Sequence, residues 1–216
     1  MRKTIVSCVI MLVVLVAWYT WTSSGGPPGT GKNSTSAISD AADNWFEEWQ
    51  NRKKYSELNP EILASIPDDK LEQALFDYIV LVIGDDYERE YEIITGLSDG
   101  FQMFYTTWIV DGEVNNGGFN QYFWNTSGEF AEAAVRGFQL IGASEHAKLM
   151  EQAIAVYRKG QPENKRFRKD GTLDAFRESY QQTDLGDVDD AYYELQEDLS
   201  ALRIRYIREH AVEFTS

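Results

Sequence analysis

The stretch Glu113-Val-Asn-Asn-Gly-Gly-Phe-Asn-Gln-Tyr-Phe-Trp-Asn125 decides how the middle of this chain folds. It joins two amides and two glycines to a segment rich in aromatic residues. Because Gly and Asn tolerate the left-handed backbone that ends many helices, the sequence predicts a helix stop at Asn115–Gly118. The aromatic residues Phe119, Tyr122 and Phe123 are then expected in the core. A rival interpretation is a polar cleft for a ligand, lined by Asn116, Asn120, Gln121 and Asn125.

Apolar residues recur at steps of three and four on both sides of this corner, and no segment alternates with a period of two. We therefore expect an all-α domain, with helices over roughly 68–83, 87–95, 99–115, 126–141, 144–159 and 173–180. A long final helix is expected from 187 to 210. Caps are predicted at Ser98 and Ser144, and a capping box at Thr126–Glu129. The apolar seam of the final helix either packs on its own domain, which we favour, or pairs with a second copy in a homodimer.

The stretch around the corner resembles the shared core of the DNA-mimic protein family. The residues that carry the resemblance are Glu113, Asn115, Asn116, Gly117, Gly118, Phe119, Gln121, Tyr122 and Asn125. The resemblance covers roughly 58–158 well and continues more loosely through 192–206. It implies a compact multi-helix fold whose surface carboxylates imitate DNA phosphates and occupy a DNA-binding protein. It implies no catalytic residues and no cofactor.

The charge of the chain is strongly negative, at −15 formal charges. All 35 acidic residues lie at Asp40 or later, whereas three of the 20 basic residues precede that point. The folded body is therefore even more acidic than the whole chain. Such a field repels nucleic acid and favours a basic partner, although an acidic surface can also serve solubility alone.

Two acidic segments are the predicted partner-binding sites. The first comprises Asp85, Asp86, Glu88, Glu90 and Glu92, and the second comprises Asp187, Asp190, Glu194 and Asp198. Residues three or four apart on a helix lie about 5–6 Å from each other, so the second set would form a phosphate-like row on the expected long helix. The competing interpretation is a solvated helix face.

The N-terminal residues predict a membrane anchor and a tether. Arg2 and Lys3 precede an uncharged apolar run, Thr4–Trp21, that is long enough to span a bilayer. We expect a signal anchor over 1–24, a flexible Gly/Ser/Thr/Pro-rich linker over 25–39 and the acidic domain over 40–216. The alternative to the anchor is a cleaved signal peptide, for which Thr22-Ser23-Ser24 offers only a weak cleavage site. The positive residues before the run place the N-terminus in the cytoplasm and the domain outside it.

Catalytic and metal-binding patterns are weak. Gly26-Pro-Pro-Gly-Thr-Gly-Lys32 imitates a phosphate-binding loop, but Asn33 replaces the magnesium-binding hydroxyl and no strand precedes it. The only histidines, His146 and His210, lack metal-ligand spacing. We therefore predict no metal, no cofactor and no enzymatic activity. The leading hypothesis is a membrane-tethered acidic module that binds a basic protein, such as a DNA-binding protein, without binding nucleic acid itself. The alternative is a small-molecule binder or enzyme with a cleft around Asn116–Asn125.

Overall fold

The computed structural model describes residues 47–160, 166 and 169–215. Contacts divide the chain into two units, Met1–Tyr55 and Ser56–Ser216, and the second contains all the elements discussed below. The predicted anchor and linker lie outside the described residues. None of the helices that the structure describes combines the length and apolarity needed to cross a bilayer.

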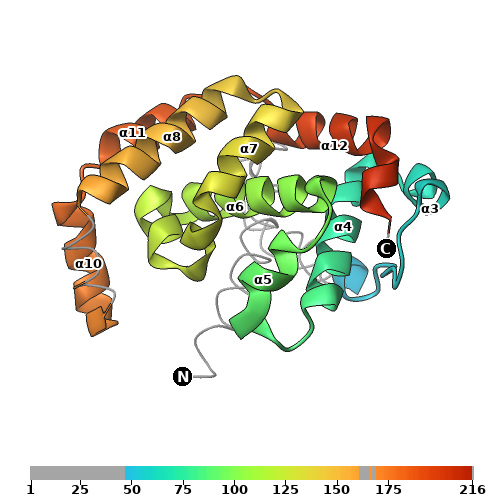
Figure 1. Cartoon of the computed structure of the whole chain (residues 1–216), viewed down its shortest axis with the longest axis horizontal. Coiled ribbons are helices and arrows are strands. Elements are labelled where there is room, and N and C mark those ends of the chain that lie inside the picture. The colour runs from blue at the N-terminus through green and yellow to red at the C-terminus, as the bar shows by residue number, and fades with distance from the viewer. Residues whose placement is uncertain (1–46, 161–165, 167–168, 216) are drawn as a thin grey trace, which may run out of the picture. The chain divides into compact units, whose positions relative to one another are not determined.

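The second unit is helical throughout its described part, which confirms the predicted fold class (Figure 1). Its first half contains α3 (Pro60–Ser65), α4 (Asp68–Ile83), η1 (Tyr87–Arg89), α5 (Glu90–Thr95) and α6 (Asp99–Trp124). Its second half contains η2 (Thr126–Phe130), α7 (Ala131–Ile141), α8 (Ser144–Lys159), α10 (Leu173–Gln182), α11 (Gly186–Tyr193), α12 (Leu199–Glu209) and η3 (Ala211–Phe214).

Helix α6 is the central element and packs against α4, α5, α7, α10 and α11 (Figure 1). Its apolar residues explain this position, because Phe104, Val110, Phe119 and Tyr122 are all fully buried. Helix α7 packs on α6, and α8 packs in turn on α7 and α11. The aromatic side chains that follow the corner therefore lie at the centre of the domain and are held from several directions.

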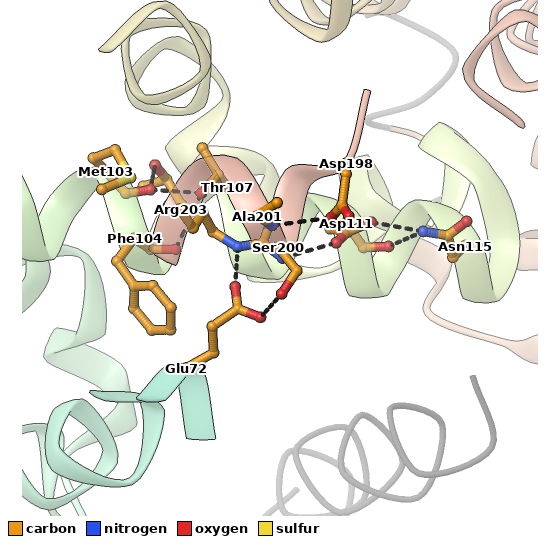
Figure 2. A network of polar contacts seen from close by, with 11 residues as sticks. Glu72, Met103, Phe104, Thr107, Asp111, Asn115, Asp198, Ser200, Ala201 and Arg203 are labelled. Atoms are coloured by element: carbon orange, nitrogen blue, oxygen red, sulfur yellow. Dashed lines mark hydrogen bonds and ion pairs between the residues drawn. The ribbon is translucent and has the colours of Figure 1, made fainter. Parts of the chain in front are cut away.

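A buried ion network joins α4, α6 and α12 (Figure 2). Arg203 is 2% exposed, and its guanidinium pairs with Glu72 of α4 and, at 3.2 Å, with Asp111 of α6. Ser200 donates a hydrogen bond to the other oxygen of Glu72 at 2.6 Å. An arginine buried in this way needs such carboxylates, because an unpaired charge is costly in a low-dielectric interior.

The prediction of one long final helix is wrong, because a non-helical segment separates Tyr193, where α11 ends, from Leu199, where α12 begins. Asp198 leaves helical geometry and its carboxylate accepts the amide of Ala201 at 2.9 Å, so it acts as the N-cap of α12. The apolar seam of 188–206 is therefore divided between two helices. The three- and four-residue spacing of apolar residues continues across this segment and therefore predicted one helix. Asp198 did not reveal the interruption, because an aspartate fits a solvent-facing helix position as well as it fits an N-cap.

Three predicted capping interactions are also absent. Thr126–Phe130 forms a 3-10 turn without a side-chain cap. Ser98 does occupy the N-cap position of α6, but its hydroxyl donates to the carbonyl of Glu213. Helix α8 has Ala143 at its N-cap, and the carboxylate of Glu197 accepts the amides of Glu145 and His146 instead. At Ser98 and at the start of α8, long-range partners take the place of the local caps.

Candidate functional site

The corner predicted at the two glycines divides α6 into two helical segments. Gly117 and Gly118 depart from helical geometry, and Gly118 has φ 68° and ψ −180°. This backbone conformation is essentially restricted to glycine. A Cβ added at Gly118 would also lie 2.4 Å from Oδ2 of Asp189. The predicted helix stop is thus confirmed, and the second glycine is required both by its backbone angles and by a neighbouring carboxylate.

Side chains from α10 and α11 satisfy the backbone groups that the corner frees. A broken helix leaves carbonyls without partners before the break and amides without partners after it. Tyr193 donates its hydroxyl to the carbonyl of Val114 at 2.8 Å, and Tyr180 donates to that of Gly117. On the other side of the corner, Oδ1 of Asp189 accepts the amide of Phe119 at 2.7 Å. We call these three side chains the corner clasp.

The clasp was not among the predicted site residues, and its members lie more than sixty positions from the corner. Asp189 is half-buried, and burial raises the pKa of its carboxyl against the opposing effect of the Phe119 amide. Burial, with the nearby Asp189 charge, raises the pKa of Tyr180 to about 12. Tyr180 therefore remains a neutral hydrogen-bond donor at physiological pH.

Glu113 is the polar centre of the predicted family motif. Its carboxylate is 2% exposed and accepts hydrogen bonds from Gln121 at 3.2 Å, from Ser127 at 2.8 Å and from Asn125. Burial raises the pKa of Glu113, while the three donors oppose the shift. Because Glu113 precedes the corner and its donors follow it, this cluster fixes the angle between the two segments of α6.

The amides proposed for a polar cleft are engaged with neighbours in the structure. Asn116 donates to Gln121 at 2.9 Å, and Asn120 donates to Ser179 at 2.8 Å while accepting from Thr183. Tyr122 is fully buried. Asn115 is exposed and bonds to Asp111, one turn earlier. The amide side chains of this region therefore bond within the domain, whereas the buried hydroxyl of Tyr122 has no hydrogen-bond partner among the described residues.

The second acidic segment presents an unneutralised face on α11. Val188 and Tyr192 point into the core, whereas Asp187, Asp190 and Glu194 are exposed. Across the described residues, no Lys or Arg forms an ion pair with any of these three carboxylates. We call Asp187 and Asp190 of α11, together with Glu194 at its C-cap, the α11 carboxylates. Asp198, predicted in the same row, lies beyond the break.

The first acidic segment is largely occupied within the domain. Arg89 forms ion pairs with Glu92 at 3.0 Å and with Asp86 at 3.8 Å. Glu90 is turned inward and accepts the hydroxyl of Tyr105. Only Asp85 and Glu88 remain exposed without a cationic partner among the described residues. The α11 carboxylates are therefore the more available of the two predicted sets.

The described residues contain no group of three or more His, Cys, Asp or Glu side chains that could hold a metal ion. His146 is buried between the rings of Phe138 and Tyr192, and its Nδ1 lies 2.7 Å from Glu197. His146 therefore lies on the inward face of α8 as a packing residue, and its bond to Glu197 joins α8 to the connection between α11 and α12.

The protein-family model of DMP19-like protein matches residues 95–210 of the chain. Comparison with curated proteins found no significant match. The matched span begins just before α6 and ends after α12, so it contains the corner, the corner clasp and the α11 carboxylates. Since this span is more than half of the chain, the protein belongs to the DMP19-like family of DNA-mimic proteins.

Proposed function

We propose that this protein is a non-enzymatic binding module that holds the basic surface of a partner protein, as a DNA mimic does, through the α11 carboxylates, Asp187, Asp190 and Glu194. Membership of a DNA-mimic family supports the class of function. The observation that supports this choice of binding surface is that the three carboxylates are exposed and have no cationic partner among the described residues. Charges already paired within the domain would gain little from a partner, whereas unpaired ones attract Lys and Arg.

The geometry of α11 suits this role. Asp187, Asp190 and Glu194 are spaced by three and four residues, so their side chains follow one face of the helix. The inward residues of α11 and the bond from Asp189 to the corner fix that face on the domain. A rigid row of negative groups would compete with DNA phosphates for the same cations of a partner.

Competition with duplex DNA tests the proposal. The full chain, immobilised on beads, is used to capture proteins from a lysate of its own cells, and each captured protein is identified and purified. The proposal predicts that duplex DNA and this protein exclude each other from the captured protein, and that binding weakens steeply as salt rises. Binding that duplex DNA leaves intact would refute the mimicry.

Matched charge variants locate the surface. The triple variant Asp187→Asn/Asp190→Asn/Glu194→Gln should lose most of the binding. The control is Glu61→Gln/Glu151→Gln/Glu209→Gln, which removes the same formal charge from exposed positions elsewhere. Equal losses in the two variants would show that net charge acts alone and that α11 has no special role.

The proposal also includes the side of the membrane on which the domain lies. Arg2 and Lys3 before the apolar run favour a domain outside the cytoplasm, where the partner would be a basic protein of the envelope. Protease added to cells whose inner membrane is intact should then cut the domain. Cleavage that requires rupture of that membrane would place the domain in the cytoplasm, together with transcription factors.

A further inference from the structure

We propose that the exposed rings of Tyr180 and Tyr193, beside the α11 carboxylates, form a contact surface selective for arginine over lysine. This inference rests on the proposed function, and it names the chemistry that the surface recognises in its basic partner. It concerns the aromatic members of the corner clasp, which hold the fold with their hydroxyl groups and leave their rings at the surface.

The two rings are exposed although their hydroxyl groups are fixed. Tyr180 is 40% exposed and Tyr193 is 50% exposed. Their hydroxyls donate to Gly117 and Val114, which lie one helical turn apart. Each ring is thus held at both ends, so a partner that binds it does not need to immobilise a mobile side chain. Rigid aromatic residues of this kind contribute strongly to protein interfaces.

The carboxylates lie where a cation on these rings would reach them. Tyr193 and Glu194 lie three and four residues after Asp190, and Asp187 lies three residues before it, so Asp190 neighbours all three along α11 and its C-cap. Asp189, at the corner, lies close enough to both tyrosine hydroxyls to raise the pKa of each phenol. The surface therefore combines neutral aromatic rings with a negative field.

Arginine suits this combination better than lysine. A planar guanidinium can stack on a tyrosine ring while its N–H groups bond a neighbouring carboxylate. The ammonium of lysine is a compact, strongly hydrated charge, and it gains less from a ring. Two preorganised rings should therefore favour an arginine-rich surface by about fivefold to thirtyfold in affinity, given about 0.5–1 kcal/mol for each exposed cation–π contact.

The test measures binding of fluorescent hexa-arginine and hexa-lysine peptides to the full chain by anisotropy. Wild-type protein should bind hexa-arginine more tightly by the factor above. Tyr180→Leu/Tyr193→Leu should reduce that ratio to about one, whereas Tyr180→Phe/Tyr193→Phe, which loses the same hydroxyl bonds but retains the rings, should keep it. Tyr91→Leu is the matched control, because Tyr91 is 47% exposed on α5. Equal affinity of wild-type protein for the two peptides would overturn the inference.

The outcomes separate this inference from the proposed function. The α11 triple variant should weaken the binding of both peptides, so an unchanged affinity there refutes the carboxylate surface itself. A ratio that survives the leucine variant refutes only the role of the rings. If the leucine variant does not fold, ring-proton shifts in the wild-type protein decide: hexa-arginine should shift Tyr180 and Tyr193 but not Tyr91, and unshifted rings would contradict the inference.

Discussion

Replacement of Gly118 by alanine tests the physical basis of the corner. The substitution places a Cβ in a backbone conformation with φ 68° and ψ −180°, which costs about 1–3 kcal/mol for a residue other than glycine. The same Cβ would lie 2.4 Å from Oδ2 of Asp189 and must displace that carboxylate. The bond from Asp189 to the Phe119 amide is then lost, at about 1.5–3 kcal/mol for a charged acceptor.

These two effects predict that Gly118→Ala lowers the free energy of unfolding by about 2.5–6 kcal/mol. That is a large part of the 5–15 kcal/mol typical of a domain. Urea denaturation followed by circular dichroism measures the change. Gly186→Ala is the matched control: a Cβ there meets no atom within 4 Å, so we expect a gain of about 0.4–1 kcal/mol or no change.

A double-mutant cycle separates strain from collision. Asp189→Ala alone should cost about 1.5–3 kcal/mol, because the Phe119 amide loses its acceptor. In that background the added Cβ meets no carboxylate, so Gly118→Ala should cost only the backbone strain. The double variant should therefore be about 1.5–3 kcal/mol more stable than the sum of the single variants predicts. Additive effects, or a Gly118→Ala variant as stable as the wild type, would refute the reasoning.

Three further predictions concern the buried charges. Arg203→Met leaves Glu72 buried without its cation and should cost about 3–5 kcal/mol in urea denaturation; a change below 1 kcal/mol would contradict the network. Glu113→Ala removes the acceptor of three donors and should cost at least about 2 kcal/mol, measured in the same way. Burial tends to raise the pKa of Glu197, but the hydrogen bonds from His146 and from the amide of Glu145 outweigh it and lower that pKa from its ordinary value. A carboxyl group whose pKa is lower in the folded than in the unfolded state stabilises the fold at pH values above the unfolded-state pKa, and this stability is lost as the pH falls through the folded-state pKa. Glu197→Gln should therefore lower Tm at pH 7, and the difference in Tm from the wild type should vanish below the lowered pKa of Glu197. A difference that is unchanged at low pH would refute this coupling.

The sequence predicted the helices and the corner because their causes are local. The periodic apolar residues of α4, α6, α7 and α8 specify one buried face each, and the structure confirms these helices within a few residues. The Asn-Asn-Gly-Gly run predicted the break in α6 because glycine is needed where the backbone leaves the helical region. The strong negative charge is likewise a property of composition.

The break between α11 and α12 could not be read from periodicity. Asp198 and Glu197 leave the helix because they cap α12 and α8, and the partner of Glu197 lies more than fifty residues away. The sequence also could not show which acidic segment is free to bind a partner, because the two segments are similarly dense in carboxylates. The structure distinguishes them, since Arg89 and Tyr105 engage carboxylates of the first segment.

The sequence by itself determined an acidic all-α domain, a glycine corner in its central helix and a resemblance to the DNA-mimic family. Only the tertiary structure decided how the corner is held, because Tyr180, Asp189 and Tyr193 reach it from segments more than sixty residues further along the chain. Local sequence shows that a broken helix frees backbone groups. Which side chains satisfy those groups, and which rings and carboxylates remain exposed as a result, depends on the packing of α10 and α11 against α6.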